Sequence, residues 1–158
     1  MKIYVASSWR NEHQQYIVAL LRMTGHDVYD FKHPETGDAG FHWGKISVHW
    51  QDWTLEQYRE ALKHEYAQFG FNRDFDAMKA ADMCVLVLPC GRSAHLEAGW
   101  MKGAGKRVVA FVPPSYKMEP ELMYGMLDDI CGDIDELMQF VHIWEKYCEK
   151  MSKTPEGK

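Results

Sequence analysis

The sequence predicts an α/β protein built as a three-layer, doubly wound parallel sheet of about five strands. Short apolar runs alternate with helical segments along most of the chain, which is the pattern of strand–helix–strand units. The run 83–88 (MCVLVL) is apolar on both faces, as a central parallel strand is. The length of 158 residues fits one domain, since two would each be unusually small.

The first strand–helix–strand unit occupies the amino-terminal end. Residues 2–6 are expected to form a short buried strand, and residues 26–31 the second strand. The helix between them ends at Gly25, because glycine takes a positive φ without steric cost. Two strands joined in this way lie parallel.

An aromatic insertion follows the second strand. Residues 32–53 contain four phenylalanine and tryptophan residues beyond position 40, which is rare in a linker, and long loops inside compact domains are usually functional. We therefore treat residues 32–70 as a cap inserted into a single domain of residues 1–151.

Two helical pieces are expected at the end of this insertion. Thr54 begins a helix in which Gln57 is placed to complete a capping box. We expect that helix to run to about Gln68 and a second piece to cover 72–81.

The second half of the chain continues the alternating pattern. We expect a strand at 83–88, a turn at 89–93, a helix at 94–103 and a strand at 107–112. A helical turn at 119–126, a short strand at 127–132, a closing amphipathic helix at 133–151 and a polar tail at 152–158 complete the chain.

Ligands of such flavodoxin-like sheets bind beyond the carboxyl ends of the strands, near the point where the strand order reverses. Three loops should meet there: 7–10, 32–53 and 89–97.

The composition excludes several classes of protein. Eighteen basic residues against 23 acidic ones give a net charge of −5, which does not favour binding to a nucleic-acid polymer or an anionic membrane. We find no signal peptide and no apolar run long enough to cross a membrane, so we expect a cytoplasmic protein. The four cysteines have no Cys-x-x-Cys spacing, which is typical of a reduced protein without a zinc ribbon.

No motif for a metal or a cofactor is present. Gly105-Lys106 lacks the earlier glycine and the hydroxyl of a Walker loop, and no Gly-x-Gly-x-x-Gly follows the first strand. His42 and His49 share a loop without metal-ligand spacing, so we interpret them as surface or cap residues. We expect neither metal nor cofactor.

The segment 90–99 (CGRSAHLEAG) is the most informative for chemistry. It joins the central strand to a helix, whose first backbone amides can receive an anion. Ser93 can cap this helix, and Arg92 can offer a guanidinium to a phosphate or carboxylate. Glu97 lies one turn in, where it either points over the strand end or is a solvated residue that favours the helix dipole.

Asp74 is a second candidate acid. Two carboxylates that face one cleft suit the cleavage of a glycosidic bond, in which one attacks or stabilises the anomeric carbon and the other handles the proton. Aromatic residues of the insertion either stack on a base or form a small second core under the loop: Phe41, Trp43, Trp50, Trp53 and Tyr58.

Three stretches together resemble the nucleoside 2-deoxyribosyltransferase family and its relatives, the deoxynucleoside monophosphate N-glycosidases. They are residues 3–9 (IYVASSW), 72–74 (NRD) and 97–99 (EAG), and the resemblance covers Lys2 to about Val112. It implies that Glu97 attacks C1′ of a 2′-deoxyribosyl group and that Tyr4 aims Glu97. It also implies that Asp74 serves the leaving base or holds the sugar.

One position departs from the family pattern. Six residues before the nucleophile, the transferases carry a base-reading aspartate and the monophosphate hydrolases a serine, whereas this chain has Gly91. Polar residues near the first strand and the helix start could form another phosphate cradle: Ser7, Ser8, Arg10, Arg92 and Ser93. We predict that these five residues bind the substrate together with Trp9, Gly91 and the three tryptophans of the insertion.

Several alternatives stay open. Transfer to a second base and transfer to water both fit, as do a nucleoside and its 5′-monophosphate as the substrate. A non-enzymatic nucleotide-binding or sensing module on the same fold is the second hypothesis, since a fold does not determine activity. A flavodoxin-like domain for another phosphorylated ligand is the third. The resemblance also implies a homo-oligomer and a role in nucleotide metabolism.

Overall fold

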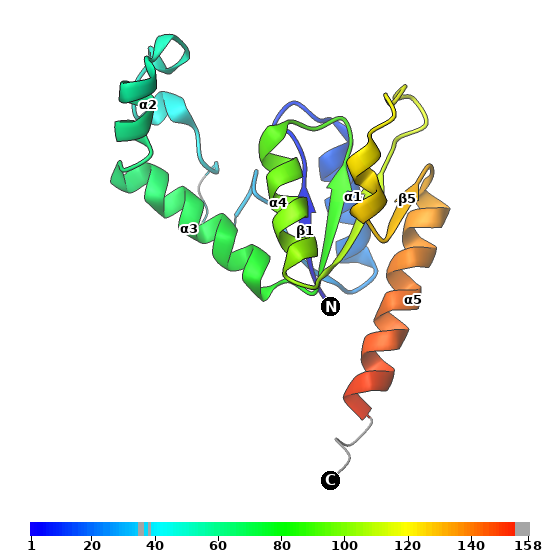
Figure 1. Cartoon of the computed structure of the whole chain (residues 1–158). Helices are drawn as coiled ribbons and strands as arrows, with labels where there is room; N and C mark the ends of the chain where they lie inside the picture. The colour runs from blue at the N-terminus through cyan, green and yellow to red at the C-terminus, as the bar shows by residue number, and fades with distance from the viewer. Residues whose placement is uncertain (35–36, 38, 154–158) are drawn as a thin grey trace.

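The computed structural model describes residues 1–34, 37 and 39–153, and its centre is a five-stranded sheet (Figure 1). All strand pairs are parallel and the strand order is β2-β1-β3-β4-β5. The strands are β1 (Lys2–Ala6), β2 (Asp27–Tyr29), β3 (Met83–Val87), β4 (Arg107–Phe111) and β5 (Asp129–Cys131). Every residue of β3 is buried, as its two-sided apolar pattern predicted.

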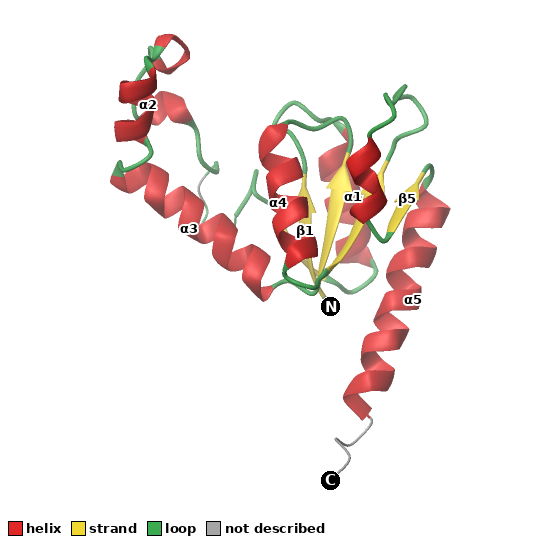
Figure 2. Ribbon diagram, viewed as in Figure 1, coloured by secondary structure: helices red, strands yellow, loops and turns green. Residues whose placement is uncertain are grey.

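Helices cover both faces of the sheet, which confirms the predicted three-layer α/β fold (Figure 2). On one face, apolar residues of α1 (His13–Met23) and α5 (Ile134–Lys153) pack on the strands. On the other face lie α4 (Arg92–Gly103) and the carboxyl end of α3 (Glu65–Ala80). The strand order reverses between β1 and β3, so the loops after these strands flank the expected ligand position.

The predicted break between the two helical pieces of the insertion was misplaced. We expected it near residues 69–71, but α2 (Leu55–Ala61) ends earlier and α3 is continuous. The His64 side chain accepts the Tyr66 amide at 3.1 Å and caps α3. Gly70 lies inside the helix, where a Cβ would come 3.0 Å from Phe41. The glycine therefore serves a close approach, not a helix end.

The start of α4 also differs from the prediction. The helix begins at Arg92, two residues earlier than expected, and Gly91 is its N-cap without a side-chain capping bond. The expectation that Ser93 caps the helix was therefore wrong, because Ser93 already lies inside the first turn.

Residues 41–64 of the insertion form an aromatic cap that projects from the sheet together with the first half of α3 (Figure 1). It contains two short 3₁₀ helices, η1 (Trp43–Lys45) and η2 (Trp50–Asp52), followed by α2. Trp43 is its centre: its ring meets Phe41 at 4.7 Å and Trp53 at 5.6 Å, both edge to face. The cap thus has a small aromatic core of its own.

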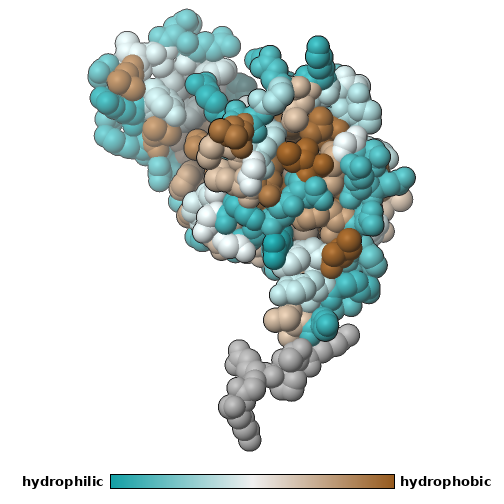
Figure 3. All heavy atoms as spheres, turned by 45° about the vertical axis from the view of Figure 1, so that its right-hand side comes forward, coloured by the Kyte–Doolittle hydropathy of each residue, from teal (hydrophilic) through white to brown (hydrophobic). Residues whose placement is uncertain are grey.

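The carboxyl-terminal part closes the other edge of the sheet. A 3₁₀ helix, η3 (Leu122–Met126), precedes β5, and Figure 3 shows hydrophobic groups among hydrophilic ones on this face. The exposed apolar residues of η3 and β5 are Leu122, Met123, Met126 and Ile130. Within the described residues, no helix combines the length and apolarity that a membrane crossing requires.

Candidate active site

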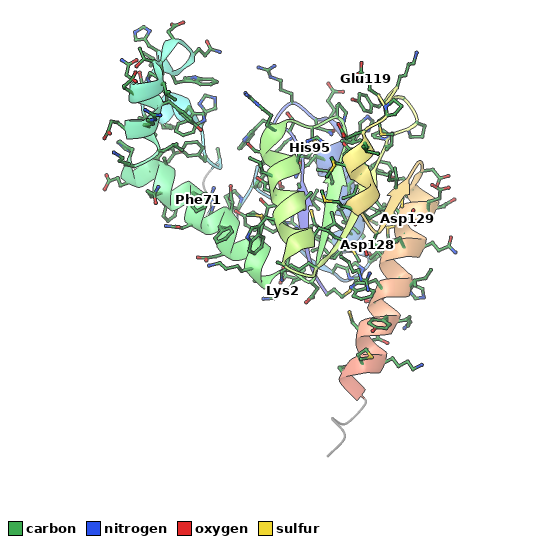
Figure 4. All side chains as sticks on the ribbon, in the orientation of Figure 1. Lys2, Phe71, His95, Glu119, Asp128 and Asp129 are labelled. Carbon is green, nitrogen blue, oxygen red and sulfur yellow. The ribbon has the colours of Figure 1, made fainter. Side chains whose placement is uncertain are left out.

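A cavity of about 390 Å³ lies between the carboxyl ends of the strands and the aromatic cap. Its volume is within the range of small-molecule sites. The loop after β1 contributes one side, the cap contributes the aromatic side, and α3 and α4 contribute the two acids, so that the lining consists of Ser7, Ser8, Trp9, Arg10, Phe31, Phe41, His42, Trp43, Trp50, Asp74, Ser93 and Glu97. In Figure 4, His95 of α4 lies toward this end of the sheet and Lys2 of β1 at the opposite end.

Glu97 reaches the cavity because of its position on α4. Ala94 and Ala98 of this helix are buried against the sheet. Ser93 and Glu97 are four residues apart and therefore share the neighbouring face of the helix, which lines the cavity. Small alanines bring the helix close to the sheet, and that places the carboxyl group over the strand ends.

The surroundings of Glu97 change its acidity. Burial raises its pKa, the charge of Asp74 raises it further, and a hydrogen bond from Tyr4 opposes the rise, with the result that the pKa is about 7. A carboxyl group with a pKa in this range changes its charge near neutral pH, which is typical of groups in active sites.

Tyr4 lies beneath the cavity and is fully buried. Burial and then the charges of Glu97 and Asp74 raise its pKa, so the phenol keeps its proton. Among the described residues its hydroxyl has no partner at ordinary hydrogen-bond distance, so its contact with Glu97 is a long one. The hydroxyl is a buried donor that faces two acids and is available to bond either of them more closely.

Tyr29 and Arg73 both approach the carboxyl group of Asp74. The Tyr29 hydroxyl lies 2.5 Å from its Oδ1, and the Arg73 Nε lies 3.6 Å from the same oxygen. Sequence reasoning missed Tyr29. The signal was available in principle, because Tyr29 is in register with Tyr4 and parallel strands place paired residues on the same face.

The loop after β1 is fastened to β3 by side chains. Ser7 Oγ donates to the Val87 carbonyl at 2.8 Å, and the buried Asn11 amide donates to the carbonyls of Val87 and Pro89 at 3.1 and 3.0 Å. Ser8 Oγ accepts the Arg10 amide at 3.2 Å, which leaves its own proton for a ligand. Sequence reasoning also missed Asn11, which aligns two of the three loops.

Aromatic rings form part of the cavity wall. Trp43 and Trp50 line the cavity, as does Trp9, whose ring meets Phe31 edge to face at 5.3 Å. His42, which we interpreted as a surface or cap residue, also lines the cavity. Its Nδ1 accepts the Gly44 amide at 2.9 Å and thereby caps η1.

Three of the predicted binding residues do not line the cavity. Gly91 and Arg92 are exposed at the start of α4, and Trp53 packs behind Trp43 as part of the cap core. The described part of the chain contains no group of three or more His, Cys, Asp or Glu side chains arranged to hold a metal ion.

Two solved structures share this fold. The 2-deoxyribosyltransferase of Bacillus psychrosaccharolyticus aligns with a TM-score of 0.60 and 22% identity over 87% of this chain and 90% of that chain. The CMP N-glycosidase BcmB of Clostridium botulinum aligns with a TM-score of 0.50 and 14% identity over 90% of this chain and 99% of that chain. No family model and no curated protein sequence matches the chain. The likeness establishes the fold that the resemblance implied.

Proposed function

We propose that the protein cleaves the N-glycosidic bond of a 2′-deoxynucleoside or its 5′-monophosphate through the nucleophile Glu97. The observation that carries this proposal is the cavity that Asp74 and Glu97 line together, with the buried Tyr4 hydroxyl near both. Two proteins with this fold are, by name, a 2-deoxyribosyltransferase and a CMP N-glycosidase, which supports the same class of chemistry.

In the first step, an ionised Glu97 oxygen attacks C1′ of the sugar. The bond from C1′ to the base nitrogen breaks, and its electron pair leaves with the base, which takes up a proton. Asp74 lines the same cavity and either supplies this proton or holds the sugar. Tyr4 donates toward Glu97 and stabilises the ionised form that attacks.

In the second step, a base nitrogen or a water oxygen attacks C1′ and releases the Glu97 carboxylate, and the proton lost by the attacking group replaces the one that the first base took up, at Asp74 or in solvent. Two displacements at one carbon give net retention of configuration. A second base as the acceptor makes the protein a transferase, and water makes it a hydrolase. The aromatic wall favours a stacked base in either case, because Trp43 and Trp50 line the cavity.

Of the two substrate forms, we favour the 5′-monophosphate. The Arg10 side chain and the hydroxyls of Ser8 and Ser93 line one cavity. The start of α4 has no side-chain cap, so its first amides are available to an anion. Ser7 is a weaker candidate than we expected, since its proton is already donated to Val87.

The test is to incubate the protein with deoxynucleosides and with their 5′-monophosphates, with and without a second free base, and to separate the products by chromatography. We expect release of free base from the monophosphate, and loss of release in Glu97→Gln but not in the exposed control Glu119→Gln. Full activity in Glu97→Gln would remove the assigned nucleophile.

The same assay separates the alternatives. New nucleotide formed from the added base identifies the transferase, and sugar phosphate formed in water alone identifies the hydrolase. Calorimetric binding of the nucleotides without any base release over long incubation would instead establish the non-enzymatic binding module.

A further inference from the structure

Tyr29 is a half-buried side chain at the site with no role in the chemistry described so far. It ends the edge strand β2, directly beside Tyr4 in the register of the parallel pair. The two rings are stacked, with centroids 5.4 Å apart and planes 13° from parallel. The phenol rings of neighbouring strands therefore form one layer beneath the acids.

The hydroxyl of Tyr29 reaches across to α3. It donates to Asp74 Oδ1 at 2.5 Å, and the two residues are 45 positions apart in the chain. A short bond to a carboxylate is among the stronger hydrogen bonds in proteins. A helical aspartate has more than one staggered rotamer available, and this bond selects the one that lines the cavity.

Tyr29 is suited to act as a permanent donor. Burial and the hydrogen bond to Asp74 raise its pKa well above the ordinary value for tyrosine, so it keeps its proton across the neutral range. Its ring contact with Tyr4 does not involve the oxygen, so loss of the hydroxyl alone leaves the packing in place.

We propose that Tyr29 is a positioning residue that holds the Asp74 carboxylate in the orientation needed at the substrate. The site then contains two phenol–carboxylate pairs, Tyr4 with Glu97 and Tyr29 with Asp74. Because the two rings stack on adjacent strands, the sheet, and not the helices alone, sets how the two acids lie relative to each other. This inference rests on the proposed function and extends it to a residue on the edge strand.

The first test is kinetic and uses Tyr29→Phe. We expect kcat to fall about 10- to 100-fold, as for loss of a hydrogen bond to a charged group, with KM little changed. The matched control is Tyr16→Phe, an exposed tyrosine on α1, which should leave kcat unchanged. In a double-mutant cycle, Tyr29→Phe should cost nothing further once Asp74→Asn is present. Equal losses in both backgrounds would overturn the inference.

The second test does not depend on activity. The three-bond coupling between the amide nitrogen and Cγ of Asp74, measured by NMR in the isotope-labelled full chain, reports its χ1 rotamers. We expect one rotamer in the wild type and an averaged coupling in Tyr29→Phe, at similar melting temperatures.

The two tests separate the two proposals. If the protein releases no base but the Asp74 coupling is averaged in Tyr29→Phe, the proposed function fails and the positioning by Tyr29 is supported. Base release with an unchanged kcat and a single rotamer in Tyr29→Phe would overturn the positioning alone.

Discussion

Replacing Glu97 by glutamine should make the folded protein more stable at neutral pH while it abolishes the proposed chemistry. The pKa of Glu97 is raised from 4.5 to about 7, mainly by burial and by the charge of Asp74. Between these pH values the folded protein keeps a proton that the unfolded chain has lost. Below pH 4.5 the group is protonated in both states and does not lower the stability of the fold. The free energy of unfolding then falls as the pH rises from 4.5 through 7.

The size of the effect follows from the pKa values. At 1.36 kcal/mol for each pKa unit, the rise from 4.5 to about 7 corresponds to about 3 kcal/mol. Glu97 is half-buried, so solvent screening reduces this to roughly 1–3 kcal/mol. Glutamine has the shape of the protonated acid and no charge, so the variant avoids this cost. For a chain of this length the gain corresponds to a rise in Tm of roughly 3–10 °C.

The assay is urea unfolding followed by tryptophan fluorescence between pH 4.5 and 8. The difference in the free energy of unfolding between Glu97→Gln and wild type should be near zero at pH 4.5 and grow to its full value above pH 7. Glu119→Gln, at an exposed loop position, should show no such growth. A difference that does not change with pH, or a variant less stable than wild type at pH 8, would refute the reasoning.

Three further predictions concern the reaction, the loop after β1 and the base of the cap. The kcat/KM of the wild type should rise with pH through about 7 as Glu97 ionises, and a flat profile would contradict its role as nucleophile. Asn11→Ala should lower the free energy of unfolding by about 2–4 kcal/mol in urea titrations, because two carbonyls lose a buried donor; an unchanged midpoint would speak against this. Gly40→Ala should destabilise by at least ~1 kcal/mol in the same titration, since φ is +71° and a Cβ would meet the Phe31 carbonyl and the Trp9 ring, whereas Gly125→Ala meets nothing and should be neutral.

The sheet and the two acids were predictable because their signals are local. An apolar run as short and complete as β3 has few other interpretations, and the positions of Asp74 and Glu97 follow from the elements that carry them. The parallel topology gathers the loops after β1 and β3 and so brings the start of α4, with Glu97, to the cavity. Asp74 reaches the same cavity from α3, which precedes β3.

The positioning residues were not predictable in the same way. Tyr29 and Asn11 act through bonds to partners 45 and 76 residues away, and no local pattern marks such contacts. Gly70 was misleading in another way, because the predicted break between two helices fell on it. Glycine usually indicates the end of a helix, but here it lies inside α3, where the cap approaches so closely that a Cβ would come 3.0 Å from Phe41.

The cap described above is covalently connected to the rest of the described chain near Gly40 and at the start of α3. The acids and the phenols beneath them belong to α3, α4 and the strands, while Trp43 and Trp50 belong to the cap. Residues 41–64 are therefore a natural unit for grafting. Exchange of this unit for one of another shape would alter which molecules the cavity admits, and mutational drift in it would leave the two acids and the phenols in place.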